Sequence, residues 1–256
     1  LNASPEPQTI ADEWILGKLN DAIESISQNI SHYRFAEARE QVYHLVWDDL
    51  ADWYIEASKQ AQNASVLNYS LATVLKLTHP FAPFVTETIW QNLDGEGLLI
   101  STSWPKTVSF KTKKAGQFAQ IQAIISEIRH IKSNLNLQGG ILAYSSNNLL
   151  DENGQLVGQL AKLSEVVATE QKEGIAITSA EGNCYYVISP ELAKQLKDSL
   201  LDNQARLKNQ IENLEARLNN KSYIQKAPEK LVNETRQELA KVRTEFAKVT
   251  DQLTQI

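Results

Sequence analysis

Residues 229–256 read EKLVNETRQELAKVRTEFAKVTDQLTQI, and their apolar side chains recur at alternating steps of three and four residues. This seven-residue period is typical of a helix that packs one narrow apolar stripe against a partner helix. The stripe consists of Val232, Thr235, Leu239, Val242, Phe246, Val249, Leu253 and Ile256. This end of the chain is therefore predicted to form a long helix paired with another.

The partner is predicted to lie directly upstream, where a similar leucine-rich stripe runs through residues 192–218. Pro190 suits the first turn of that helix, because a helix start needs no N–H there. Residues 219–228, NNKSYIQKAP, separate the two stripes. Two stripes of similar length with a short connection predict an antiparallel coiled-coil hairpin, an arm roughly 40 Å long.

Residues 8–93 show the 3.6-residue periodicity of amphipathic helices, and Pro80 with Pro83 divides the last two. In the second helix, Phe35, Trp53 and Tyr54 keep the same apolar period. The stripes lie at residues 14–30, 35–54, 66–77 and 84–93. Such helices with short connections predict a helical bundle.

A pattern change follows Gly139-Gly140, where short β-branched and aromatic runs replace the helical period. Strands are predicted near residues 141–144, 166–169, 174–178 and 184–188, with helices at 117–135 and 156–163. The fold class is thus mainly α, with a small α+β module. We expect a bundle and connection at 1–114, a helix plus α+β module at 115–189, and the arm at 190–256.

Composition is that of a globular protein, with 42% hydrophobic and 22% charged residues. No apolar run approaches the roughly 20 residues of a membrane span, and the single Cys184 cannot form an internal disulfide, so a cytoplasmic location is predicted. The net charge is −6, but residues 190–256 hold 12 Lys+Arg and 10 Asp+Glu. The arm is therefore the basic part of an acidic chain. Because the chain begins at Leu1, we expect it to be a fragment.

Catalytic motifs are missing from the sequence: it has no P-loop, no paired-cysteine metal spacing and no nucleophile elbow. We interpret the acidic run of Asp48, Asp49 and Asp52 as a solvated helix face, and the scattered histidines as packing or surface residues. No catalytic residue, metal site or cofactor is predicted for this chain.

Two groups of residues are candidates for RNA contacts, since unpaired bases stack on aromatic rings and phosphates attract Arg and Lys. The bundle group is Arg34, Arg39, Trp47, Trp53, Tyr54 and Lys59. The arm group is Arg206, Lys208, Arg217, Lys221, Tyr223, Lys226, Lys230 and Arg236. The alternative interpretations are that Trp53 or Tyr54 is a core residue, and that the arm charges are only the solvated face of a coiled coil.

Several runs resemble a known family. DEWILGKLN (12–20), YRFAEAREQVYHLVWDDLADWYIEASK (33–59) and LTHPFAPFVTETIWQNL (77–93) are similar to the anticodon-binding bundle of class I aminoacyl-tRNA synthetases for branched aliphatic amino acids. LNNKSYIQKAPEKLVNETRQEL (218–239) resembles the coiled-coil arm of the valine-specific family. That resemblance covers almost the whole chain.

The resemblance implies tRNA(Val) as the partner, with neither membrane nor DNA, and a monomeric parent enzyme that joins valine to tRNA using ATP. The His-x-Gly-His and Lys-x-x-Lys-Ser motifs that hold ATP in this family are missing, so chemistry would lie in other domains. This chain would position the tRNA. Two alternatives remain open: a coiled-coil adaptor that binds proteins, and the same region of another branched-aliphatic synthetase.

Overall fold

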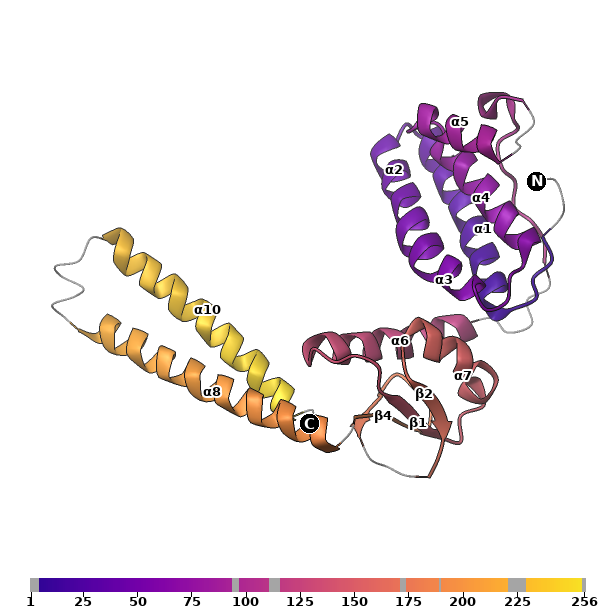
Figure 1. Ribbon diagram of the computed structural model, residues 1–256. Coiled ribbons are helices and arrows are strands. Elements are labelled where there is room, and N and C mark those ends of the chain that lie inside the picture. The colour runs from indigo at the N-terminus through magenta and orange to yellow at the C-terminus, as the bar shows by residue number, and fades with distance from the viewer. Residues whose placement is uncertain are drawn as a thin grey trace. The chain divides into compact units, whose positions relative to one another are not determined.

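The computed structural model of the chain (Figure 1) describes residues 5–93, 97–110, 116–170, 174–188, 190–220 and 229–254. The chain divides into two compact units. The first consists of Leu1–Ile125 and Glu152–Leu160, and the second of Ser126–Asp151 and Ala161–Ile256. Helices dominate both, and the second also holds a small mixed sheet, so the chain is mainly helical as predicted.

The first unit contains the bundle. Its helices are α1 (Ile10–Ser31), α2 (Phe35–His44), the π-helix η1 (Leu45–Tyr54), α3 (Ile55–Ser58), α4 (Ala64–Thr78), α5 (Pro83–Asn92) and the 3₁₀ turn η2 (Leu99–Ser101). A capping box starts α1: the Asp12 backbone N–H donates to Thr9 Oγ1, and the Thr9 N–H donates to the Asp12 carboxylate. Pro83 lies in the first turn of α5, which confirms the predicted break.

The core of the bundle is built on α1, which packs against α2, η1 and α4. Ile15, Leu16, Leu19 and Ile26 of this helix are fully buried. Burying one such side chain stabilises the fold by about 1.5–3 kcal/mol relative to leaving it in water. The predicted apolar stripe of the first helix is therefore the face that organises the bundle.

A buried carboxylate ties three elements of the bundle together. Asp12 is 1% exposed, and its side chain accepts hydrogen bonds from Tyr54 Oη at 2.8 Å and Asn63 Nδ2 at 3.1 Å. The backbone N–H groups of Gln8 and Thr9 each donate to it at 3.0 Å. Because a buried carboxylate is tolerated only when it is well hydrogen-bonded, this network joins α1, η1 and the start of α4.

The second unit contains four strands in the order β2-β1-β4-β3. They are β1 (Ile141–Ser145), β2 (Glu165–Ala168), β3 (Ile175–Ala176) and β4 (Asn183–Val187). β1 pairs parallel with β2 and antiparallel with β4, which also pairs with β3. The strands lie where they were predicted, but β3 is shorter. Helix α7 (Asn148–Leu160) starts earlier than predicted, because Asn147 Oδ1 accepts the Leu150 N–H at its first turn.

Gly140 allows the chain to enter β1 close to the ring of Tyr186. Its φ is +95°, and a Cβ there would lie 2.4 Å from that ring. The Tyr186 hydroxyl donates to the Gly139 carbonyl at 2.9 Å, which holds the ring across the glycines. Only glycine fits this position.

A second carboxylate organises the loop after β3. Glu127 of α6 (Gln117–Asn134) accepts bonds from the backbone N–H and hydroxyl of both Thr178 and Ser179, at 2.6–2.9 Å. Burial opposes ionisation of Glu127, but these four bonds outweigh it and lower the pKa of the carboxyl. The loop is thus fastened to α6 by an ionised side chain.

The last two helices, α8 (Pro190–Asn219) and α10 (Glu229–Thr254), run side by side in Figure 1. Leu207, Leu214, Val242 and Val249 form the centre of their apolar seam. Gln204 donates to Thr250 at 3.0 Å and Arg243 to Glu215 at 2.6 Å. Since residue numbers rise along one helix as they fall along the other, the two helices are antiparallel.

Candidate nucleic-acid interface

Exposed aromatic rings gather where α1 turns into α2. Tyr33 is 82% exposed and Phe35 is 52% exposed, and their ring centroids are 6.1 Å apart in an edge-to-face arrangement. Tyr33 has a φ of +58°, a left-handed backbone conformation that bulky residues rarely adopt. Phe35 keeps the apolar period of the second helix, but it is half exposed and contacts the Tyr33 ring, so it does not belong to the core.

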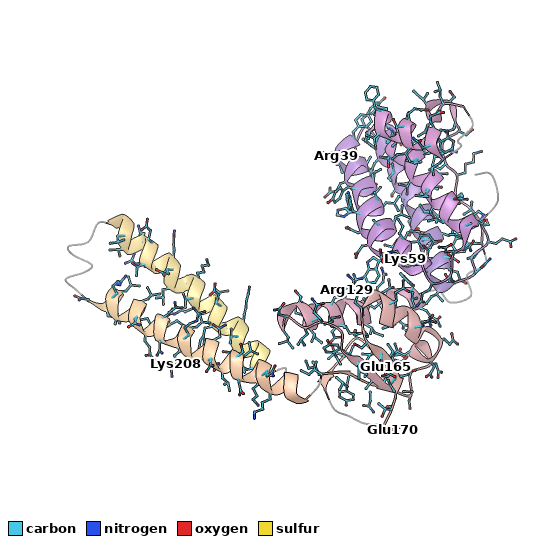
Figure 2. The ribbon with its side chains drawn as sticks, in the orientation of Figure 1. Arg39, Lys59, Arg129, Glu165, Glu170 and Lys208 are labelled. Carbon is cyan, nitrogen blue, oxygen red and sulfur yellow. The ribbon has the colours of Figure 1, made fainter. Side chains whose placement is uncertain are left out.

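Phe35 also starts a row of exposed side chains that continues through α2 into η1. Arg39, Tyr43 and Trp47 follow at steps of four residues, so all four lie on one side of the helix. Tyr43 is 57% exposed and Trp47 is 58% exposed, with ring centroids 6.4 Å apart. We call Phe35, Arg39, Tyr43 and Trp47 the aromatic stripe. Figure 2 labels Arg39 on α2.

Only Arg39 and Trp47 of the stripe were among the predicted contacts. Tyr43, and Tyr33 beside the stripe, were not among them. The signal was present in the sequence, since an aromatic or arginine residue stands at every fourth position from 35 to 47. A 3.6-residue hydrophobic period indicates the buried face of a helix and does not single out its exposed residues.

The acidic run next to the stripe is partly paired. The His44 ring lies 2.6 Å from the Asp48 carboxylate, and this hydrogen bond raises the pKa of His44. Asp49 lies 3.5 Å from Lys18 Nζ; burial raises the pKa of Asp49, although Lys18 opposes the shift. Among the described residues no group of three His, Cys, Asp or Glu side chains could hold a metal. Asp48 and Asp49 of the run are therefore engaged with His44 and Lys18.

Tyr54, Trp53 and Lys59 were also predicted to contact RNA, but they do not belong to the aromatic stripe. Tyr54 is fully buried and bonded to Asp12, so its ring cannot stack on a base. Trp53 is half-buried and meets the ring of Phe118 edge-on at 6.3 Å. The helical period predicted a continuous core face here, but η1 is a π-helix, whose i→i+5 bonding changes which side chains face inward.

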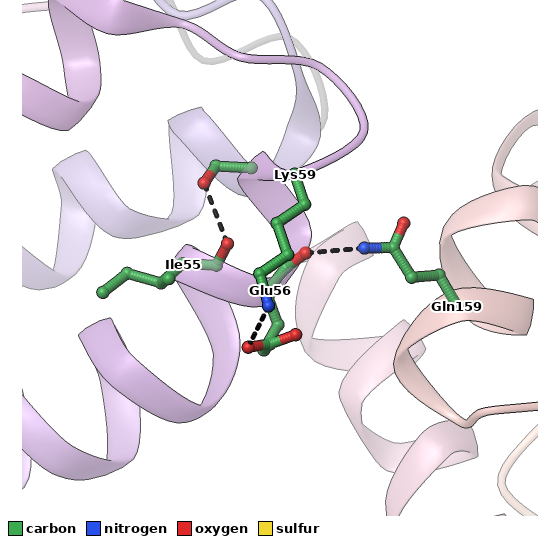
Figure 3. Close-up of polar contacts among 5 residues, drawn as sticks. Ile55, Glu56, Lys59 and Gln159 are labelled. Carbon is green, nitrogen blue, oxygen red and sulfur yellow. Dashed lines mark hydrogen bonds and ion pairs between the residues drawn. The ribbon is translucent and has the colours of Figure 1, made fainter.

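Lys59 is exposed at the end of α3, and its ammonium group lies 2.6 Å from Glu56 (Figure 3). Gln159 Nε2 of α7 donates to the Glu56 carbonyl at 2.9 Å. An exposed pair of this kind contributes little to stability. Lys59 is thus available to a phosphate but lies apart in sequence from the aromatic stripe.

The remaining predicted bundle residue, Arg34, precedes α2 and is exposed. On the helix pair, Arg206, Lys208, Arg217 and Arg236 are all exposed, and Figure 2 labels Lys208 on α8. Lys221, Tyr223 and Lys226 lie outside the described residues. Lys230 belongs to the first turn of α10, and its side chain is likewise outside the described part of the chain.

Acidic residues accompany the exposed cations of the pair, as they do in the sequence. Glu212 and Glu234 are exposed, while Glu215 is half-buried and bonded to Arg243. The surface of the pair therefore alternates in sign, and no aromatic ring of its described residues is fully exposed. Its predicted RNA contacts would act through charge.

The single thiol is not a reactive group. Cys184 is buried in β4, and this burial raises its pKa to about 12. A thiol is a nucleophile or metal ligand only as the thiolate, which hardly forms at neutral pH under these conditions. None of the described helices is long and apolar enough to cross a membrane.

Comparisons with known proteins match two parts of the chain. Residues 12–141 match the family described as the anticodon-binding domain of tRNA ligase. Residues 192–256 match the family described as the valyl tRNA synthetase tRNA binding arm.

Curated relatives match almost the whole chain. The valine--tRNA ligase of Carboxydothermus hydrogenoformans is 31% identical over 91% of this chain and 29% of its own length. The ligase of the same name from Staphylococcus carnosus is 30% identical over 97% of the chain and 31% of its length. That from Thermotoga maritima is 29% identical over 93% and 30%. The chain thus spans about 30% of the length of these relatives.

Proposed function

The chain belongs to the valyl-tRNA synthetase family, and from this premise we propose that it positions tRNA(Val) for a valine--tRNA ligase. The observation that carries the proposal is that both family matches fall on elements with exposed RNA-compatible side chains. The anticodon-binding match covers the aromatic stripe, and the arm match covers the basic α8/α10 pair. In this function the chain supplies affinity and orientation.

We infer that α8 and α10 form a coiled-coil arm that reaches along the tRNA. Support comes from the seven-residue period of α10 and from the seam of Leu207, Leu214, Val242 and Val249. With 30 and 26 residues, the helices are about 45 and 39 Å long at 1.5 Å per residue. A pair this long with a single-row seam presents most of its surface to a partner.

The arm would lie against the outer corner of the tRNA, where folded loops present phosphates. Exposed Arg and Lys side chains bind phosphates without reading sequence, and such binding weakens steeply with salt. The bundle would face the anticodon loop, whose unpaired bases can leave the stack. Each part would therefore use the chemistry that its exposed side chains offer.

The whole enzyme would join valine to tRNA with ATP, and the ATP and valine sites would lie outside this chain. We propose a cytoplasmic location and a monomeric enzyme, as the family resemblance implies. The match of residues 192–256 to a valyl-specific arm favours valine over isoleucine or leucine, and it favours an RNA role over a protein adaptor.

The test is filter binding of the chain to tRNA(Val), tRNA(Ile) and tRNA(Leu) transcripts at roughly 50–200 mM salt, because phosphate contacts lose much of their affinity over this range. We expect tRNA(Val) to bind most tightly, with affinity falling steeply as salt rises. Equal, salt-independent binding of all three, or no binding, contradicts the proposal.

A further inference from the structure

A cavity of about 340 Å³ lies in the first unit, away from the aromatic stripe. The first residues of α1 form one wall, the end of α3 with the turn that follows it forms the second, and the middle of α7 forms the third. Every lining residue belongs to the described part of this unit. Cavities of roughly 300–1,000 Å³ are the size in which proteins bind small molecules.

The walls of this cavity are held in place by hydrogen bonds within the chain. Gln60 Nε2 donates to the Gln155 carbonyl of α7 at 3.0 Å. Gln159 Nε2 of the same helix donates to the Glu56 carbonyl of α3 at 2.9 Å (Figure 3). The α1 wall begins at the capping box of Thr9. A ligand therefore meets a formed site and needs little rearrangement of the chain.

The lining of the cavity is acidic. Glu13 of α1 and Glu152 of α7 both line it, and none of its lining residues is Lys, Arg or His. The nearest cation in sequence, Lys59, is paired with Glu56 at 2.6 Å. Two carboxylates without a lining cation attract a positively charged ligand and repel an anion.

The start of α1 does not reverse this sign. A helix N-terminus attracts anions through N–H groups that lack a partner in the helix. Here the Asp12 carboxylate accepts the N–H groups of Gln8 and Thr9, and Thr9 Oγ1 accepts the N–H of Asp12. These donors are satisfied within the chain, so they do not make this wall a site for an anion.

The uncharged part of the lining favours a ligand with an aliphatic body. Ile10, Ala57 and Leu156 offer methyl and methylene surface, and no lining residue carries an aromatic ring. Quaternary ammonium groups are typically held by aromatic cages, which this lining does not provide. A primary ammonium instead donates hydrogen bonds, which carboxylates and the amide oxygens of Gln60 and Asn153 can accept.

We propose that this cavity binds a short aliphatic di- or polyamine. Its ammonium groups pair with Glu13 and Glu152, and its methylene chain packs on the aliphatic walls. The inference goes beyond the proposed function and uses neither of the proposed RNA surfaces. Because the site exists only in the folded chain, the ligand stabilises the fold increasingly as its concentration rises.

The test is isothermal titration calorimetry of the whole chain, without RNA, using the diamine putrescine as the probe. Butanediol keeps the methylene chain without the charges, and succinate reverses the charge. We expect one putrescine to bind per chain, and both analogues to bind at least about tenfold more weakly because they form no charge-assisted hydrogen bond to the carboxylates.

Amide NMR shifts locate the binding. We expect putrescine to move the signals of residues 8–13, 57–61 and 152–156, and to leave those of α8 and α10 in place although both helices carry exposed carboxylates. Shifts spread over the acidic residues of the whole chain would mean general charge attraction and would overturn the proposal.

Glu152→Gln keeps the shape of an exposed side chain of α7 and removes its charge, and we expect it to weaken putrescine binding about tenfold. The matched control is Glu24→Gln, which changes an exposed carboxylate of α1 outside the cavity and should leave binding unchanged. Ala61→Leu enlarges a lining side chain, and it should also weaken binding because it fills part of the cavity. Circular dichroism checks that all variants remain folded.

Three further outcomes overturn the inference: no putrescine binding up to about 10 mM, butanediol binding as tight as that of putrescine, or an equal loss of affinity in Glu24→Gln. Because no RNA is present, none of these results bears on the proposed tRNA function, which filter binding tests separately.

Discussion

The bundle and the α8/α10 pair both expose cations, but they are stabilised in different ways. The bundle has a deep core and a buried polar network around Asp12, and it can therefore hold exposed rings on a rigid face. The pair has a single-row seam, and its described surface alternates in charge. Rigid presentation of aromatic rings and long electrostatic reach therefore need different architectures.

The largest loss of stability is expected from a substitution at the centre of the bundle. Tyr54→Ala removes a fully buried ring and leaves the Asp12 carboxylate without one of its donors. We expect the free energy of unfolding to fall by about 3–5 kcal/mol. Urea denaturation followed by tryptophan fluorescence measures this loss.

The paired control is Trp47→Ala, which removes a ring that is 58% exposed and should change the same free energy by less than about 0.5 kcal/mol. If both substitutions cost the same, the division of the bundle into core and contact faces is wrong.

A smaller loss is expected in the seam of the helix pair. Leu207→Ala opens a gap in a row only one residue wide, and we expect a cost of about 2–4 kcal/mol because neighbouring side chains can close part of the gap. Hydrogen exchange should report faster exchange in α8 and α10 alone. Simultaneous loss of protection in α1 and α4 would mean that the two parts do not unfold separately.

The next effect concerns binding through charge. Replacing both Arg206 and Lys208 by Ala removes two exposed cations from α8. We expect weaker tRNA(Val) binding, and a plot of log affinity against log salt concentration whose steepness falls by about two. Sequence reasoning predicts the same for Lys221 and Lys226. Glu212→Gln on the same helix is the matched control, and it should strengthen binding. An unchanged slope in the double variant argues that α8 does not touch phosphates.

The smallest expected effect is a pH-dependent change in stability from the His44–Asp48 pair, next to the Trp47 end of the aromatic stripe. Asp48, and more weakly Glu40 and Asp49, hold the pKa of His44 above its ordinary value. Because the pKa of His44 is higher in the folded chain than in the unfolded chain, the pair stabilises the fold fully at pH values below the unfolded pKa of about 6.5. This stabilisation is lost as the pH rises through the pKa of His44 in the folded chain. Asp48→Asn should lower the pKa of His44 in an NMR titration. A titration that does not move contradicts the pairing.

Much of this arrangement could be predicted from sequence, because it depends on local spacing. The stripe of α10 follows directly from its seven-residue period, and Pro83 and Pro190 mark helix starts through the geometry of their own rings. Gly140 indicated a change of structure, although its close approach to Tyr186 could not be foreseen. Contacts between residues distant in sequence leave no periodic signal.

The candidate site was predicted less well, because it depends on contacts between residues that are distant in sequence. Nothing in the spacing of Tyr54 indicates that its hydroxyl meets Asp12, 42 residues away. The π-helical turn at residues 45–54 also changes the direction of Trp53 and Tyr54 without altering the amphipathic pattern. Arg39 and Trp47 were named as candidates by residue type, and both are exposed, whereas the exposure of Tyr33 and Phe35 depends on the turn between α1 and α2.

The buried thiol of Cys184 gives the molecule a built-in reporter. It is the chain's one cysteine, and it lies in β4 between β1 and β3. An alkylating reagent can therefore reach this thiol only when the sheet opens, so the modification rate under native conditions measures opening of the sheet. Following that rate while tRNA(Val) is added would reveal whether binding of the tRNA stiffens the sheet, without introducing any label.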